Sequence, residues 1–507
     1  MEARDLVLYN TLTRAKERFS PLREGEVRMY VCGPTVYDLS HVGHARKEVV
    51  FDVIARHFRS CGYRLLYVRN ITDVDDKIIA RANEEGVPAE EIAKRYEAAF
   101  REDMESLGVL PPDHEPRATE TIPEMLDLIA ELLKKGYAYC ASGSVYFSVG
   151  CRQDYGKLSG RRLEEMLAGA RVDPDAAKRD PLDFALWKGA KPGEPSWPSP
   201  WGEGRPGWHI ECSAMSRKFL GETLDIHGGG MDLIFPHHEN EIAQSESATG
   251  RPFCRFWIHN GLLTVSREKM SKSLGNFVTV REALKSCHPE VLRLFFLSHH
   301  YRSPVDYSDE AIGTTRKNLD YFYNTLLRIR EICGEETLRR QDSSAERQGG
   351  GAGYGLQDME SEFVEAVGNL EERFRAALFD DFNTAQALGE LFRAASYLNR
   401  WMDGSDRARS ERGQSVLATF RRELLSAGRV LGLFGQDPVL WFRRQPDSAG
   451  LPAGALSDSE VEERIRVRQE ARRKKDWKQA DAIRAELEGQ GIVLEDTPQG
   501  TRWKRKG

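Results

Sequence analysis

The chain has 507 residues, too many for one hydrophobic core. At roughly 150 residues per domain, about three domains are expected. Hydrophobic residues make up 40% and charged residues 30%, as is ordinary for a soluble globular protein, and no apolar run reaches the roughly 18 residues of a membrane span. The net charge of −6 argues against indiscriminate nucleic-acid binding, although it permits a local basic patch.

The N-terminal residues and the cysteines indicate a cytoplasmic protein. The chain begins Met-Glu-Ala-Arg-Asp-Leu-Val, which lacks the basic and apolar regions of a signal peptide. Eight cysteines, at positions 32, 61, 140, 151, 212, 254, 287 and 333, lack the dense, even spacing of a disulfide framework. We therefore expect reduced thiols, some of them metal-bound, and no membrane partner.

The first 135 residues predict alternating strands and helices. The predicted elements are a strand at 27–32, a helix at about 40–60, a strand at 64–71, and helices over 75–78 and 90–135. Gly33 and Pro34 stop the first strand. Thr72 and Asp73 follow the second strand and can cap the next helix.

Residues 143–207 interrupt this alternation. Pro, Gly and Trp cluster at 191–207 and predict an irregular insertion, which extends over about 119–207 at its widest. Strand patterns return at 223–227 and 253–265. An α/β fold is therefore expected over residues 1–307, with one parallel sheet and an insertion.

Residues 225–241 predict a strand, a loop and a helix at the mouth of a pocket. The strand is expected to end at His227, the glycines 228–230 to form a turn, and Pro236 to open the helix. In such a helix His237 and Glu241 lie one turn apart and can bind the same ion, whereas His238 points away from that ion. The alternative is that His237 only packs near a helix start.

The last 200 residues predict a helical bundle and a basic tail. Apolar residues spaced by three or four predict helices over 308–444. Residues 341–357 are rich in Gly, Ser and Gln, and this composition predicts a flexible loop. A second stretch of this kind, at 445–454, precedes the tail. Between Val461 and Gly507 the tail has 13 Lys or Arg against 9 Asp or Glu, a balance of +4.

Two segments are typical of a nucleotide site. His41-Val42-Gly43-His44 lies where a strand turns into a helix, and free amides and the helix dipole attract phosphate there. Gly43 leaves room for a flat ring. Residues 269–276, Lys-Met-Ser-Lys-Ser-Leu-Gly-Asn, form a loop of cations and hydroxyls that can close on a triphosphate. Alone, these would be a helix cap and a charged turn; together they favour nucleotide binding.

These motifs resemble the HIGH and KMSKS signatures of class I aminoacyl-tRNA synthetases. Four further segments resemble the cysteinyl-tRNA synthetase family: residues 31–38, 70–77, 207–212 and 227–232. Only residues 341–357 lack a clear counterpart. The resemblance implies a Rossmann-type nucleotide-binding catalytic domain at 1–307 with its KMSKS loop at 269–273, an α-helical bundle at 308–444, and a small basic C-terminal anticodon-binding domain at 455–507.

The resemblance also implies one zinc ion per chain. Its ligands would be Cys32, Cys212, His237 and Glu241, a set that suits the borderline-soft ion. Zinc would bind the thiolate of cysteine, a bond that a hydroxyl or methyl group cannot replace. Spacing by itself supports only the His237 and Glu241 pair, and isolated cysteines are often merely packed.

Roles for other residues follow from the same resemblance. The implied catalytic residues are His41, His44, Lys269 and Lys272. These four would bind ATP together with Gly43 under the adenine and Asp232 at the ribose, and Mg²⁺ would accompany the nucleotide. The implied cysteine-binding residues are Gly33, Thr72, Trp208 and His227.

The implied activity is ATP-dependent activation of L-cysteine to cysteinyl-adenylate and its transfer to the 3′ end of tRNA(Cys), by a monomer. In the tail, cations alternate with tryptophans and suit contact with phosphates and unpaired bases. The implied tRNA-binding residues are Arg472, Arg473, Lys474, Lys475, Trp477 and Trp503. A solvated charged helix is the simpler alternative.

Two other functions stay open at this point. A ligase of the mycothiol pathway makes the same adenylate and joins cysteine to an amino sugar, but it ends after a shorter helical region. A non-catalytic zinc-binding RNA module is a further alternative, and the intact histidines and lysines of both nucleotide motifs argue against it.

Overall fold

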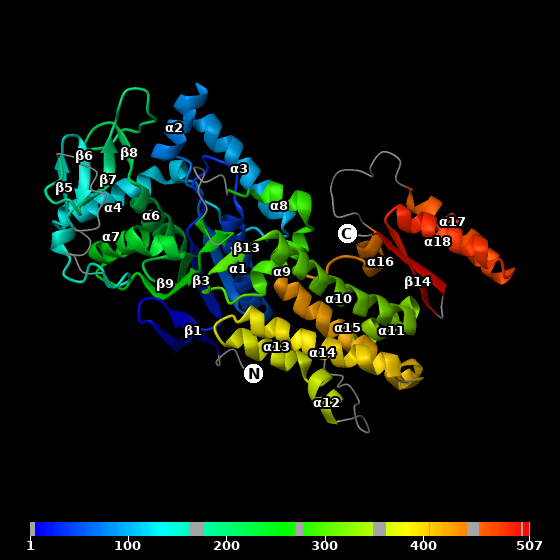
Figure 1. Cartoon of the computed structure of the whole chain (residues 1–507). Helices are drawn as coiled ribbons and strands as arrows, with labels where there is room; N and C mark the ends of the chain where they lie inside the picture. The colour runs from blue at the N-terminus through cyan, green and yellow to red at the C-terminus, as the bar shows by residue number, and fades with distance from the viewer. Residues whose placement is uncertain are drawn as a thin grey trace. The chain divides into compact units, whose positions relative to one another are not determined.

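The computed structural model describes residues 6–161, 177–266, 268–269, 277–347, 361–404, 406–443, 456–497 and 500–505. The chain divides into two compact units. The first contains the residues up to Val280 together with Phe296–Ser308 and Glu372–Leu388. The second contains Arg281–Phe295, Asp309–Glu371 and Gly389–Gly507 (Figure 1).

A four-stranded parallel sheet forms the centre of the first unit, as predicted. Its strands lie in the order β10-β9-β3-β4. Their bounds are β3 Glu26–Val31, β4 Arg64–Arg69, β9 Leu224–Gly230 and β10 Cys254–Asn260. Helices cover parallel sheets on both faces, which explains why these strands are nearly continuous runs of buried residues.

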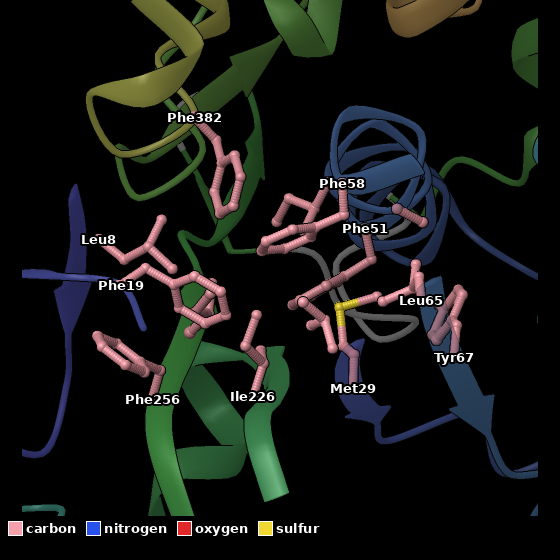
Figure 2. Close-up of a cluster of buried hydrophobic side chains, with 14 of the residues drawn as sticks. Leu8, Phe19, Met29, Phe51, Phe58, Leu65, Tyr67, Ile226, Phe256 and Phe382 are labelled. Carbon is pink, nitrogen blue, oxygen red and sulfur yellow. The ribbon is translucent and has the colours of Figure 1, made fainter. Parts of the chain in front are cut away.

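Helix α1 (Val42–Ser60) packs on this sheet through its apolar face. Phe51 and Phe58 of α1 are buried with Met29, Ile226 and Phe256 of the sheet, and Figure 2 shows the rings converging between strand and helix. Each such side chain contributes about 1.5–3 kcal/mol when fully buried. This packing holds the middle of α1 against β3 and β9, and Lys47 near its start bonds to the Cys32 carbonyl at the end of β3.

The next helices start and end at other residues than predicted. They are α2 (Asp76–Glu85), α3 (Ala89–Ser106), the 3₁₀ helix η2 (Ala118–Thr121) and α4 (Ile122–Lys134). Asp75 caps α2 through Lys77 N, whereas Asp73 accepts hydrogen bonds from Thr119, so the predicted cap was wrong. The predicted continuous helix over 90–135 is interrupted because Gly108 adopts a φ of 67° and two prolines follow it.

The insertion contains an antiparallel sheet, although an irregular segment was predicted. Its strands, in the order β5-β6-β7-β8, are Ala138–Ala141, Ser144–Phe147, Phe184–Gly189 and Gly204–Pro206. A 3₁₀ turn, η3 (Val149–Cys151), follows β6. These strands have only three to six residues, which leaves little local periodicity to detect, and β6 pairs with β7 across more than 30 intervening residues.

The glycines 228–230 extend strand β9 and do not form the predicted turn. A Cβ atom on Gly228 would lie 2.4 Å from the Phe51 ring, and one on Gly229 would lie 3.0 Å from His238 Cε1. Glycine is needed here for close approach of rings rather than for a bend. The chain turns afterwards, through η4 (Met231–Leu233) and a wide helical turn, η5 (Ile234–His238), into α7 (Glu239–Thr249).

The remaining elements of the first unit flank this sheet. A hairpin forms the N-terminus, with β1 at Val7–Asn10 and β2 at Ala15–Arg18. Helix α6 (Trp208–Leu220) leads into β9. The strand predicted at 253–265 is in fact two, because β11 (Leu263–Val265) belongs to a separate sheet with β12 (Glu268–Lys269) and β13 (Val305–Tyr307).

The described residues between 309 and 443 are mostly helical, as predicted for 308–444, and two further helices precede them. The helices are α8 (Val280–Ser286), α9 (Pro289–Leu297), α10 (Asp309–Cys333), α11 (Glu335–Arg347), α12 (Ser361–Val367), α13 (Leu370–Phe379), α14 (Thr384–Gly404), η7 (Asp406–Arg409), α15 (Glu411–Leu431) and α16 (Pro438–Arg443). Residues 341–347 of the predicted flexible loop are helical in α11. The rest of that loop up to residue 357, and the second loop at 445–454, lie outside the described residues.

The tail folds as a small α/β element. Helices α17 (Asp458–Arg473) and α18 (Trp477–Gly489) precede a hairpin of β14 (Ile492–Thr497) and β15 (Gly500–Arg505). Its own core consists of Val461, Ile465, Leu487, Ile492, Leu494 and Trp503. Among the described helices of the whole chain, none combines the length and the apolar character needed to cross a bilayer.

Candidate active site

Four side chains from three segments converge at one end of the central sheet. Cys32 directly follows β3, Cys212 lies in α6, and His237 and Glu241 lie where η5 passes into α7. All four are buried, and one potential ligand atom from each lies within 4.8 Å of the others. The structure thus brings together the complete set implied by the sequence resemblance, and this cluster could hold a metal ion.

The distances within this cluster fit a tetrahedral ion. The sulfurs of Cys32 and Cys212 lie 3.7 Å apart. Two thiolates on one tetrahedral zinc ion would lie about 3.8 Å apart, given Zn–S bonds of about 2.3 Å. His237 Nε2 lies 3.0 Å from Glu241 Oε1. Glu241 Oε2 is buried and lies 3.3 Å from His227 Nε2 but makes no hydrogen bond of good geometry among the described residues, so it can still take an ion.

The protonation of the four groups reflects strong mutual interaction. Burial raises the pKa of Cys32 well above its usual value. Burial also raises that of Cys212, but the hydrogen bond from Cys32 and the neighbouring His237 outweigh this effect and lower its pKa to about 6. Burial lowers the pKa of His237, whereas Glu241 and Cys212 raise it to about 10. A thiolate and Glu241 thus carry negative charge, which the positive charge of His237 offsets only in part, and the excess favours a cation.

Surrounding residues hold these side chains in place. The other ring nitrogen of His237, Nδ1, lies 2.9 Å from His209 Nδ1. The Trp208 ring stacks on the His237 ring, with centroids 4.2 Å apart. Lys47 Nζ of α1 donates to the Cys32 carbonyl over 2.6 Å. Such contacts fix the orientation of first-sphere groups.

His238 was predicted to point away from the cluster, and this prediction was wrong. Its Nε2 atom lies 3.3 Å from Cys32 Sγ. With His227, Cys32 and Glu241 it forms a second set of grouped ligand atoms within 4.8 Å. The non-helical Phe235 in η5 changes the angle at which the helix begins, so regular α-helical spacing misplaced His238.

The four residues implied for amino-acid binding lie around the metal cluster. The Gly33 amide donates to Asn70 Oδ1 over 2.8 Å, and a Cβ on Gly33 would lie 1.6 Å from the Asn70 carbonyl oxygen. Thr72 is buried, Trp208 is half-buried, and His227 is fully buried with Nε2 3.6 Å from Cys32 Sγ. The first position therefore requires glycine. His227 contacts the Cys32 sulfur, Trp208 stacks on the ligand ring of His237, and the Thr72 hydroxyl bonds to Glu211, the neighbour of Cys212.

Glu211 is a polar residue of this region that sequence reasoning missed. It accepts a hydrogen bond from the Thr72 hydroxyl over 2.9 Å. Burial, followed by the neighbouring Cys212, raises its pKa well above the usual value. Its place directly before Cys212 in the Gly207–Cys212 segment was the available signal.

His41 and His44 lie together at the start of α1. Their rings stack with centroids 3.7 Å apart, and His41 Nδ1 accepts hydrogen bonds from the Gly43 and His44 amides over 3.1 and 3.3 Å. The amides that were expected to be free are thus engaged by the cap. Burial lowers the pKa of His41 to about 4, with Asp232 opposing this shift. The cap uses Nδ1 as an acceptor, so the proton of the neutral ring is assigned to Nε2.

Most of the KMSKS loop lies outside the described residues. Lys272 lies outside the described residues. For Lys269 the structure describes only the backbone, in β12.

The tail residues fall into two groups. Arg472, Arg473, Lys474, Lys475 and Trp477 lie around the junction of α17 and α18, where Trp477 is 58% exposed. Trp503 is only 8% exposed and packs in the core of the tail. The structure therefore does not bring Trp503 to the exposed cations.

Comparison with protein families gives three matches along the chain. The family described as tRNA synthetases class I (C) catalytic domain matches residues 18–317. The DALR domain matches residues 373–435, and the cysteinyl-tRNA ligase anticodon binding domain matches residues 457–503.

Individual proteins resemble the chain over its full length. The "Cysteine--tRNA ligase" of Syntrophobacter fumaroxidans is 52% identical over 500 residues, which cover 98% of this chain and 99% of that protein. The protein of the same name from Geobacter sulfurreducens is 52% identical over 503 residues, covering 99% and 100%. Among solved structures, Mycobacterium tuberculosis methionyl-tRNA synthetase in complex with methionyl-adenylate has a TM-score of 0.58 at 19% identity and covers 81% of this chain and 94% of its own; this likeness concerns the fold.

Proposed function

This chain belongs to the cysteine--tRNA ligase family of class I tRNA synthetases, and on that premise we propose that it activates L-cysteine with ATP and transfers the cysteinyl group to the 3′ end of tRNA(Cys). The observation that carries the proposal is the buried cluster of Cys32, Cys212, His237 and Glu241. It lies at the carboxyl ends of β3 and β9, where open parallel sheets bind their ligands.

The metal in this proposal is zinc, one ion per chain. Two thiolates, one imidazole and one carboxylate form a donor set typical of zinc. When bound, zinc supplies a Lewis acid that takes the substrate thiol as thiolate, a bond that serine and alanine cannot form. The chain's own residues then orient the amino acid.

The residues around the cluster supply this orientation. Gly33 leaves space beside Asn70, and we assign Thr72, Trp208 and His227 to the backbone and side chain of the bound cysteine. Thr72 already donates to Glu211, so its hydroxyl has a fixed direction. Holding the carboxylate in line with the α-phosphate is the main requirement, because positioning can contribute many orders of magnitude to such reactions.

The nucleotide residues would act on charge that develops during adenylate formation. The carboxylate oxygen of cysteine bonds to the α-phosphorus of ATP, and the bond to the pyrophosphate oxygen breaks. The Nε2 proton of His41 and an N–H of the His44 ring are assigned as donors to phosphate oxygens, Gly43 lies under the adenine, and Asp232 binds the ribose. Lys269 and Lys272 would neutralise charge on the leaving pyrophosphate, and Mg²⁺ bound with ATP would supply further positive charge.

In the second step the terminal ribose hydroxyl of tRNA attacks the cysteinyl carbonyl, and AMP leaves. We assign residues 1–307 to the catalytic domain, 308–444 to the helical bundle and 455–507 to anticodon binding. Arg472, Arg473, Lys474, Lys475 and Trp477 are the proposed tRNA contacts. We place the enzyme in the cytoplasm as a monomer. An amino-sugar acceptor is not favoured, because residues 457–503 match an anticodon-binding domain.

The test combines pyrophosphate exchange with tRNA charging. Purified protein is expected to exchange pyrophosphate into ATP with cysteine, and not with serine or alanine, and to charge tRNA(Cys). Zinc content should be close to one ion per chain. Exchange with cysteine but no charging of tRNA would contradict the proposed acceptor, and exchange with serine as fast as with cysteine would contradict the role of the metal.

A further inference from the structure

A chain of three side chains leads from the N-terminal hairpin to the metal cluster. Thr11 Oγ1 lies 2.8 Å from His259 Nδ1, and His259 Nε2 lies 2.8 Å from His238 Nδ1. His238 Nε2 lies 3.3 Å from Cys32 Sγ. His238 and His259 are buried, and each of their four ring nitrogens faces one of these partners. The proposed function uses none of the three side chains.

The direction of these hydrogen bonds follows from the sulfur. A metal-bound Cys32 is a thiolate and can only accept, so we assign a proton to His238 Nε2. His238 Nδ1 is then an acceptor, His259 Nε2 carries the next proton, and His259 Nδ1 accepts from the Thr11 hydroxyl. This assignment requires His259 to be neutral, and burial together with His227 lowers its pKa to about 3.

The hairpin that carries Thr11 is held in register with β10. Asn10 uses its side-chain amide as strand backbone would: Nδ2 donates to the Arg255 carbonyl over 2.8 Å, and Oδ1 accepts from Trp257 N over 3.1 Å. The Thr11 amide donates to the Trp257 carbonyl over 2.9 Å. These bonds set the Thr11 hydroxyl beside His259, two residues further along β10.

The strand β9 leaves room for the relay. His259 pairs with Gly229 in the parallel ladder, and a Cβ on Gly229 would lie 3.0 Å from His238 Cε1. A side chain at this position would displace the His238 ring. The second glycine of the triplet therefore serves the contact between His238 and Cys32.

We propose that Thr11 and His259 are positioning residues for the metal centre, acting through His238 to present an N–H to the Cys32 sulfur. This inference rests on the proposed zinc site. The N–H group holds the Cys32 sulfur in the orientation of a ligand. Without the relay, His238 can adopt the other tautomer and turn a lone pair toward the sulfur, which repels the thiolate and weakens the site.

The test measures zinc release into an excess of a coloured chelator from the purified full-length protein. Thr11→Val removes the hydroxyl at nearly constant volume, Thr11→Ser retains it, and His259→Phe retains an aromatic ring without nitrogens. We expect zinc release to accelerate about 10- to 100-fold in His259→Phe and roughly three- to tenfold in Thr11→Val, and to stay at the wild-type rate in Thr11→Ser. In pyrophosphate exchange, the KM for cysteine should rise in His259→Phe and in Thr11→Val, while the KM for ATP stays constant.

Several results would overturn the relay. Wild-type rates of zinc release in both His259→Phe and Thr11→Val would do so, as would equally fast release from Thr11→Ser and Thr11→Val, because packing of the methyl group would then be the cause. Should His259→Phe fail to fold, the comparison of Thr11→Val with Thr11→Ser tests the relay by itself. Wild-type protein without zinc would refute the proposed function and the relay together, whereas zinc-bound wild type with unaltered variants refutes the relay alone.

Discussion

The charged groups of the metal cluster are buried, whereas most of those in the basic tail are exposed to solvent. At the cluster, Cys212 and Glu241 are 1% and 0% exposed, and each polar group is oriented by its neighbours. In the tail, Trp477 is 58% exposed, and cations such as Lys474 pair with acids on the same helix, Glu470 in this case over 3.0 Å. Burial makes an unpaired group costly and so fixes geometry, whereas exposed pairs contribute little and leave the side chains adaptable.

This difference predicts where single substitutions have large effects. Each buried group is part of one mutually dependent set, so the loss of one member should abolish a function. Each exposed group makes one of several contacts, so its loss should weaken binding by a limited factor.

The largest effect is expected from Cys212→Ser. A hydroxyl does not replace the thiolate ligand, so cysteine-dependent pyrophosphate exchange should fall by roughly 10⁴-fold or more while ATP binding persists. Calorimetry with ATP and with cysteine measures the two affinities separately. Cys287→Ser, at a buried cysteine outside the cluster, is the matched control and should leave both unchanged. Equal loss of both ligands in Cys212→Ser would indicate general unfolding.

Lys272→Ala should slow adenylate formation by about 10²- to 10³-fold. The lost cation would neutralise pyrophosphate in the transition state, so cysteine affinity should change little. Rapid-quench measurement of cysteinyl-adenylate in a single turnover gives the rate. An unchanged rate would remove the loop from catalysis.

Removal of the residues after Gly454 should separate the two regions. Pyrophosphate exchange is expected to survive, because the buried cluster and the nucleotide motifs remain intact. Charging of tRNA should fall on the order of 10- to 100-fold through weaker binding, with a shallower dependence on salt because phosphate contacts are lost. Filter binding at several salt concentrations tests this. If the shortened enzyme charges tRNA as well as the full chain does, the tail has no part in tRNA binding.

The two tryptophans of the tail allow an exposed and a buried side chain to be compared within one small domain. Trp477→Ala should weaken tRNA binding by about 1–3 kcal/mol if the exposed ring stacks on a base. Trp503→Ala should instead lower the stability of the tail by about 3–5 kcal/mol, because it leaves a cavity in the core. Thermal unfolding and tRNA titration of both variants distinguish the two effects. A destabilised Trp477→Ala or a stable Trp503→Ala would reverse the assignment.

The smallest effect concerns hydrolysis of mischarged tRNA, for which no activity is expected. A site that binds a specific polar group can reject an analogue lacking it by about 10⁴-fold without a second site. Seryl-tRNA added to the enzyme should therefore decay at its spontaneous rate. Rapid release of serine would show that the insertion, or another part of the chain, carries an editing site.

Residues close together in the sequence established much of this picture. The 27–32 strand, the helix that follows it and the pair His237 and Glu241 were predicted from local periodicity, because each depends on hydrogen bonds and contacts over a few residues. The family resemblance supplied Cys32 and Cys212 as partners. Sequence spacing alone could not, since 180 residues separate them and only the sheet and α6 bring their sulfurs to 3.7 Å.

Tertiary structure decided what each residue contacts. It extended β9 through three glycines, because the rings of Phe51 and His238 occupy the space where side chains would be. It turned His238 toward Cys32, and it buried Trp503 while leaving Trp477 exposed. The physical reason is the same in each case: periodicity tells which face of an element is apolar, but packing against distant segments determines which atoms meet there.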